Sequence, residues 1–162
     1  MSEATQAPGM VYTTTTKVTE TPADALVLMC SDRRFQEAFR EFLSTHLGLQ
    51  RWDALATPGG AYMLSFAEVL PKQLKVGTRM VKFMMQASQP ARIIVINHEG
   101  CKRYLEAFHS QLSKFGFSLP DKQRRDLQSV AKDLRDAFPD ATVEPYYATL
   151  APDGTCGFER VS

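Results

Sequence analysis

Two runs of consecutive apolar residues, each followed by an amphipathic stretch, constrain the fold more than any other feature of this sequence. The first run is Ala25-Leu26-Val27-Leu28-Met29, and the second, at residues 92–97, contains Ile93-Ile94-Val95-Ile96. Short uninterrupted apolar runs are typical of strands that are buried on both faces, as in parallel sheets. We therefore predict that both runs are strands of a parallel sheet covered by helices.

Three stretches with apolar residues three or four positions apart predict helices that pack on this sheet. They lie at residues 35–47, 104–112 and 121–138. Asp121 is expected to cap the third of these helices. A fourth helical stretch is expected at 62–87, with interruptions at Pro71 and Gly77, because proline and glycine weaken helices.

Three further segments are predicted to be strands: 54–57, 142–150 and 155–161. The last two flank the turn sequence Pro152-Asp153-Gly154, which predicts a hairpin. The alternation of strands and helices predicts an α/β fold with a mainly parallel central sheet flanked by helices and a C-terminal strand hairpin. We interpret 24–162 as one domain, and the polar residues 1–23 as a mobile tail or an arm that orders against a partner subunit.

The charge balance argues against several kinds of partner. The chain has 19 Lys and Arg against 18 Asp and Glu, so neither nucleic acid nor an anionic membrane is expected to bind it. No apolar run approaches the ~18–20 residues that span a bilayer, and the N-terminus does not resemble a signal peptide. With three cysteines, one is left over from any internal pairing, which favours reduced thiols and a cytoplasmic location.

Residues that bind metals follow the two apolar runs. Cys30 follows the first run, His98 follows the second, and Cys101 comes three positions later. In open α/β sheets, sites form beyond the carboxyl ends of the strands, so these side chains converge if the two strands are neighbours. Two thiolates and one imidazole suit zinc, and three protein ligands leave the fourth position open, as in catalytic zinc sites.

Asp32 and Arg34 lie close to the first of these cysteines. Two thiolates cancel the charge of the metal, so bound water is acidified less than at an all-histidine site. A further group beside the metal is therefore needed to activate the water. A carboxylate beside the metal can accept the proton of bound hydroxide and orient it, and a paired guanidinium keeps that carboxylate ionised. A thiol phosphatase is excluded, because Gln36 stands where that class has arginine. The common nucleotide-binding motifs are also absent.

The pattern Cys30-x-Asp32-x-Arg34 followed by His98-x-x-Cys101 resembles the β-class carbonic anhydrases. The resemblance implies a lyase that reversibly hydrates carbon dioxide to bicarbonate by zinc-bound hydroxide. Cys30, His98 and Cys101 would be the zinc ligands, and Asp32 and Arg34 the catalytic dyad beside them. It also implies a homodimer or a larger assembly of identical chains.

The likeness covers roughly residues 24–160, and the chain departs from the family in three places. The usual Arg-Asn-Ala-Gly segment is Thr57-Pro58-Gly59-Gly60, and Lys102 replaces a glycine. The interval of 68 residues from position 30 to position 98 is long, which suggests an extra loop near 72–78. Backbone N–H groups at Gly59 and Gly60 are expected to contact substrate.

These departures keep two other functions open. One is a zinc hydrolase of a related small molecule, carbonyl sulfide or carbon disulfide. The other is a non-catalytic zinc-binding relative. His46 and His109 are interpreted as packed or surface residues, and Cys156 as an inert thiol.

Overall fold

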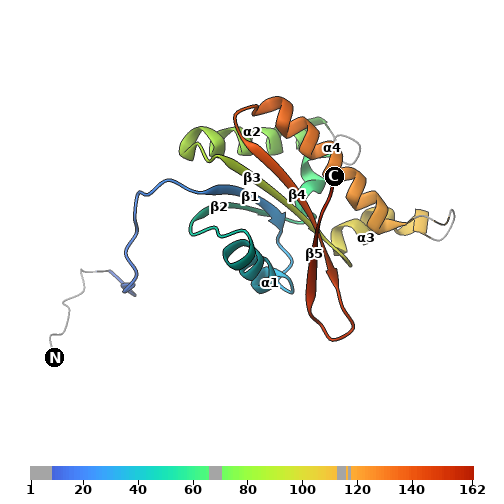
Figure 1. Cartoon of the computed structure of the whole chain (residues 1–162), viewed down its shortest axis with the longest axis horizontal. Coiled ribbons are helices and arrows are strands. Elements are labelled where there is room, and N and C mark those ends of the chain that lie inside the picture. Colours follow the sequence, from blue (N-terminus) through green and yellow to red (C-terminus); the bar gives the residue numbers. More distant parts are fainter. Residues whose placement is uncertain (1–8, 66–70, 113–115, 117) are drawn as a thin grey trace.

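Five strands form a single sheet in the order β2-β1-β3-β4-β5 (Figure 1). Their bounds are Ala25–Cys30 (β1), Trp52–Thr57 (β2), Arg92–His98 (β3), Thr142–Leu150 (β4) and Cys156–Arg160 (β5). Neighbouring strands from β2 to β4 are parallel, and β4 and β5 form an antiparallel pair. The computed structural model describes residues 9–65, 71–112, 116 and 118–162. The predicted α/β fold, with its parallel sheet and C-terminal hairpin, is confirmed.

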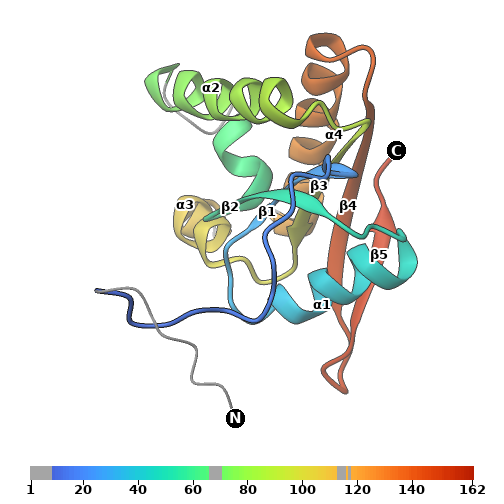
Figure 2. The ribbon, with the colours of Figure 1, turned by 90° about the vertical axis from the view of Figure 1, so that its left-hand side faces the viewer.

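Side chains of the two central strands alternate between two helical layers. On one face they pack against helices α2 (Pro71–Ser88) and α4 (Leu119–Ala137). On the other face they pack against aromatic residues in and around helix α1 (Gln36–Glu41), which lies below the sheet in Figure 2, on the opposite side from α2. The first face receives Leu26, Leu28, Ile93 and Val95, and the second receives Val27, Met29, Ile94 and Ile96. Both strands are therefore buried on two sides, which explains their uninterrupted apolar sequences.

The helix predicted after β1 has two parts. α1 is followed by a π-helix at Phe42–His46, where the N–H of Leu47 donates to the carbonyl of Phe42. This wider last turn keeps Phe42 and Leu43 buried against the sheet. The predicted apolar stripe is correct, but its helix is not a regular α-helix throughout.

The prediction for residues 62–87 was wrong in two respects. α2 runs without interruption through Gly77, so the extra loop expected near 72–78 does not exist. Gly77 is the point where α2 meets a 3₁₀-helix, η2 (Gly60–Leu64), and a Cβ there would lie 3.0 Å from Leu64 Cδ2. The glycine therefore serves close packing of two helices. Residues 66–70 of the predicted stretch lie outside the described residues.

The remaining helices are α3 (Lys102–Leu112) and α4. The N-cap of α4 is Ser118, whose Oγ accepts a hydrogen bond from the N–H of Asp121, so the predicted cap at Asp121 was wrong. Residues 9–22 are exposed and contain no helix or strand, and residues 1–8 are not described. No helix in the described part of the chain is long and apolar enough to cross a membrane.

Candidate metal centre

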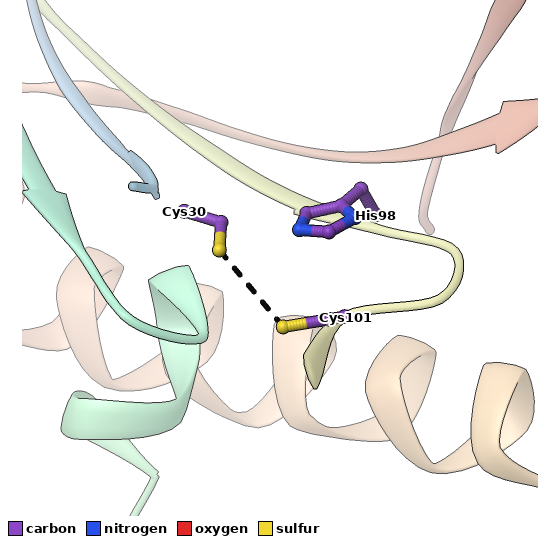
Figure 3. Close-up of side chains that lie close together, drawn as sticks. All are labelled: Cys30, His98 and Cys101. Carbon is purple, nitrogen blue, oxygen red and sulfur yellow. Dashed lines mark hydrogen bonds between the residues drawn. The ribbon is translucent and has the colours of Figure 1, made fainter. Parts of the chain in front are cut away.

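The three predicted ligands meet at the carboxyl ends of two neighbouring strands (Figure 3). Cys30 ends β1, His98 ends β3, and Cys101 immediately precedes α3. The Sγ atoms of the two cysteines are 3.9 Å apart. One donor atom from each of the three residues lies within 4.8 Å of the other two. The two strands are neighbours, which is the condition that the sequence analysis set for these donors to converge.

The ring of His98 is oriented so that one nitrogen faces the two sulfur atoms without a hydrogen bond. Its Nδ1 lies 2.8 Å from the carbonyl oxygen of Glu99, and because that oxygen can only accept, Nδ1 carries the proton. Nε2 then holds the lone pair, is buried, and has no hydrogen-bond partner among the described residues. A buried acceptor of this kind is costly unless something binds it.

The distances and the donor set both fit zinc. A tetrahedral zinc ion with two thiolates at about 2.3 Å separates the sulfur atoms by about 3.8 Å. The 3.9 Å between the two Sγ atoms is close to that value. All three residues are less than 5% exposed, so the chain presents a dry, preformed set of three ligands. Cys30, His98 and Cys101 thus fit the metal that the resemblance implies.

The two thiols share one proton. A hydrogen bond from Cys101, together with one from the Gly59 N–H, lowers the pKa of Cys30, although burial opposes this. The same bond to Cys30, and burial, raise the pKa of Cys101. The Gly59 N–H lies 3.4 Å from the Sγ of Cys30 and stabilises negative charge on that sulfur. Binding a metal releases the remaining proton, because zinc takes thiolates.

Asp32 and Arg34 form a two-pronged ion pair beside this cluster. Arg34 Nη2 lies 2.6 Å from Oδ2 of Asp32, and Arg34 Nε lies 3.1 Å from each carboxylate oxygen. These hydrogen bonds lower the pKa of Asp32 to about 2 against a smaller opposing effect of burial. Arg34 also donates to the carbonyl of Gly100, between the two ligands on the second loop. Asp32 is therefore ionised, held by Arg34, and outside the three-ligand cluster.

A pocket of about 250 Å³ opens over the cluster. Its wall includes both cysteines, Asp32 and Gly59. Four cations also line it: Arg33, Arg34, Lys102 and Arg103. Among the described residues, Asp32 is the sole acidic one in the lining, so the pocket is electropositive although the whole chain carries only +1.

Of the other residues singled out from sequence, Gly59 and Gly60 adjoin the ligand cluster, whereas His46, His109 and Cys156 are not part of it. Gly60 is buried behind the pocket, and its neighbour Gly59 directs its N–H to a ligand sulfur. His46 is exposed and stacks on Phe42. His109 is exposed on α3, and Cys156 lies on β5.

Three residues that hold the site were missed from sequence. Phe35 lies against the ring of His98, with ring centres 4.0 Å apart. Gln36 donates to the main-chain oxygens of Cys30 and Asp32, and Gln123 donates to that of His98. One signal was available: Gln123 lies four positions before Leu127, a polar residue on the largely apolar stripe of α4.

Comparison with known proteins supports the fold. No family model and no curated protein matches the chain. Among solved structures, a carbonic anhydrase from Glaciozyma antarctica matches with a TM-score of 0.56 at 13% identity, over 89% of this chain and 85% of that one. A carbonic anhydrase from Streptococcus mutans matches with a TM-score of 0.56 at 15% identity, over 92% and 88%. The β-carbonic anhydrase CafA of Aspergillus fumigatus gives 0.50 at 13%, over 86% and 76%.

Proposed function

We propose that this chain is a zinc lyase that reversibly hydrates carbon dioxide to bicarbonate. The fold is β-carbonic-anhydrase-like, as the structural matches show. The observation that carries the proposal is the unpartnered Nε2 of His98 among the described residues, buried beside two cysteine sulfurs at zinc-compatible spacing. Cys30, His98 and Cys101 would hold the ion. When bound through three protein ligands, zinc supplies an activated water at its open position.

Asp32 is the residue proposed to accept a proton or hydrogen bond from the reacting group. A carboxylate offers about four acceptor positions. Arg34 fills three of them with its backbone N–H, Nε–H and one Nη2–H, with Nε shared between the two oxygens. One position is left for an O–H in the pocket, and the low pKa of Asp32 keeps the group ionised there. Arg34 thus fixes Asp32 and leaves it free to accept one further hydrogen bond.

The pocket lining supports a small substrate with an anionic product. Its volume of about 250 Å³ suits a molecule of a few atoms. The four cations of the lining favour bicarbonate, whereas neutral carbon dioxide gains little from them. Substrate contact by the backbone of Gly59 and Gly60 stays a prediction.

Metal analysis and stopped-flow carbon dioxide hydration test the proposal together. We expect one zinc per chain and zinc-dependent turnover. C101A should lose the metal, whereas C156A, the matched control, should keep both metal and turnover. D32N should retain zinc and lose about 10²–10⁴-fold in turnover, the usual range for a lost acid–base group.

The outcomes also separate the alternatives. A zinc-loaded chain that turns over carbonyl sulfide or carbon disulfide but not carbon dioxide is the related hydrolase. A zinc-loaded chain inactive on all three is a non-catalytic binding protein. Unchanged turnover in D32N would remove Asp32 from the mechanism.

We further propose that the chain works as a homodimer or larger homo-oligomer in the cytoplasm, where its free thiols stay reduced. Exposed apolar side chains support the assembly, because a second copy would bury them. They lie on the arm at Met10, Val11, Tyr12 and Val18, and on α2 at Val76, Met80 and Phe83. The division into an arm at 1–23 and a zinc-binding domain at 24–162 stays a prediction. Light scattering after size-exclusion chromatography measures the number of copies, and a monomer would contradict the assembly.

A further inference from the structure

Gln123 is a buried polar residue on the face of α4 that packs against the sheet. It is 1% exposed, and both ends of its amide are satisfied. Its Nε2 donates to the main-chain oxygen of His98 at 2.9 Å, and its Oε1 accepts from the hydroxyl of Tyr147 at 3.1 Å. The Tyr147 hydroxyl therefore fixes which end of the amide faces His98.

An apolar side chain would serve the packing of α4 equally well. Gln123 continues the stripe formed by Leu127, Val130, Ala131 and Leu134, all of which are apolar and buried. Burying an amide costs free energy unless it is hydrogen-bonded, so packing alone does not explain an amide here. Its two partners, and the carbonyl of His98 in particular, do explain it.

That carbonyl belongs to a segment that the sheet holds from one side. The paired residues of β1 and β3 end at Met29 and Ile96, whereas β3 stays paired with β4 as far as His98. The main chain beyond Ile96 therefore diverges from β1, which opens the space for the ligands. Gln123 supplies a contact to the main chain at the point where the pairing with β1 has ended.

The peptide that Gln123 holds, between His98 and Glu99, directly precedes the peptide whose carbonyl orients the ligand ring. The ring Nδ1 of His98 donates to the carbonyl of Glu99, the next residue. A rotation of the peptide between His98 and Glu99 would move that acceptor and turn Nε2 away from the two sulfur atoms. The contact to Gln123 thus acts on the direction of Nε2 without touching it.

A neighbouring contact from α4 acts on the residues that flank both ligands of this loop. Asp126, three positions after Gln123, accepts from the hydroxyl of Tyr104, and that hydroxyl accepts from the side chain of Asn97. Asn97 precedes His98, and Tyr104 follows Cys101 by one helical turn. One face of α4 therefore fixes both sides of the loop that carries two of the three donors.

We propose that Gln123 is a positioning residue of the metal centre, which fixes the His98 imidazole for metal binding through the main chain. The inference rests on the proposed metal site and not on any particular reaction. Partners of this kind around a ligand are commonly worth 10- to 100-fold in metal affinity. We expect a similar loss here, although Gln123 lies outside the pocket.

Binding of Co²⁺ to the metal-free full-length chain tests the inference without any assay of turnover. Chelator competition gives the affinity, and the visible absorption of the Co²⁺ complex reports ligand geometry. Q123L and Q123E both remove the donor to His98, and we expect at least about tenfold weaker binding with a shifted absorption spectrum. Q128L is the matched control, because Gln128 lies on the same helix and donates its amide to a main-chain oxygen, that of Ser162.

A purely structural role predicts a different result. General destabilisation would lower the melting temperature of the metal-free chain but leave the absorption spectrum of the Co²⁺ complex unchanged. Y147F keeps the amide and frees its orientation, so it should weaken binding by less than Q123L, and it serves as the test if Q123L does not fold. Wild-type affinity and spectrum in Q123E and Y147F would overturn the inference.

The experiment distinguishes a failure of this inference from a failure of the proposed function. A wild-type chain that binds neither Co²⁺ nor Zn²⁺ would overturn the metal centre and, with it, both proposals. A chain that binds metal without hydrating carbon dioxide would overturn the reaction, while the comparison of Q123L with Q128L still decides the role of Gln123.

Discussion

Gly60 occupies a position where the backbone and its surroundings both exclude a side chain. Its φ of +55° lies in the left-handed region, which disfavours other residues. A Cβ would lie 2.7 Å from the carbonyl oxygen of Ile96, 2.8 Å from Oδ1 of Asn97 and 3.1 Å from the N of Cys30. These atoms belong to the two central strands and to the side chain that fixes the Ala61 N–H, so they cannot easily move.

G60A should therefore destabilise the chain and disturb the metal site together. We expect a loss of about 2–5 kcal/mol in the free energy of unfolding, from left-handed strain and overpacking combined. Urea unfolding measures this loss, and zinc content reports the site. G154A is the control, since Gly154 also has a positive φ, of +86°, but nothing within 4 Å of its Cβ position. Equal losses in the two variants would contradict the steric argument.

At this scale, the sequence predicted the three candidate ligands that the structure brings together, but not the residues that hold them. Cys30 and His98 could be found because each ends a strand with an unmistakable apolar pattern, and Cys101 because of its spacing from His98. Gln123 and Phe35 act through contacts made only when distant elements pack together. Such contacts have no local signature beyond a polar residue on an apolar stripe.

Among the elements, α4 depends on its first turn for capping. The hydroxyl of Ser118 accepts from the N–H of Asp121, at 3.3 Å, and satisfies one of the free donors of that turn. S118A should destabilise the chain by about 1 kcal/mol, the usual value for a lost N-cap. S129A, on the exposed side of the same helix, should be neutral or slightly stabilising, because alanine is the better helix former. Thermal unfolding of both variants tests the difference, and a loss in S129A as large as in S118A would contradict it.

β3 and β4 are joined by a half-buried ion pair that makes their pairing sensitive to pH. Arg92 Nε lies 2.8 Å from Oε1 of Glu144, and the Tyr146 hydroxyl donates to Oε2. Burial raises the pKa of Glu144, but the hydrogen bonds from Arg92 and Tyr146 outweigh it and hold the pKa below its ordinary value of 4.5. Ionised Glu144 therefore stabilises the fold above pH 4.5, and this contribution is lost as the pH falls through the folded-state pKa.

E144Q should remove that dependence. The variant should be less stable than the wild type at pH 7, and the difference should shrink as the pH falls below 4.5, because the wild type then loses the charge as well. Y146F removes the hydrogen bond that the Tyr146 hydroxyl donates to Glu144. The stability of this variant at pH 7 should lie between that of the wild type and that of E144Q. Urea unfolding across this pH range measures the effect, and a constant difference between E144Q and wild type would rule out Glu144 as its source.

The strands were better predicted than the helix boundaries. β1 and β3 carry a pattern set by burial on both faces, which the sequence records directly. The course of residues 62–87 was misjudged because Gly77 marks a close approach between helices, and glycine serves that purpose as readily as it ends a helix. The π-helix after α1 reflects packing of Phe42 and Leu43 against the folded sheet, which no local sequence pattern specifies.

For the whole molecule, metal binding and folding are coupled. The donors come from two strands and a helix start, so we expect the folded chain to bind zinc far better than the unfolded one and to be stabilised by it. Removing the metal with a chelator should lower the melting temperature of the wild type and of C156S, because Cys156 lies on β5, away from the donors. C30S should melt at a low temperature with or without chelator. A chelator-induced shift in C30S equal to that of the wild type would contradict the coupling.

The placement of the donors on separate, adjacent strands also bears on biosynthesis. Cys30 emerges from the ribosome 71 residues before Cys101, and the chain between them contains β2, α2 and β3. A nascent chain that has not yet released the start of α3 offers a single sulfur and no closed chelate. Binding of an ion through all three proposed ligands therefore requires that the crossover from β1 to β3 has been completed.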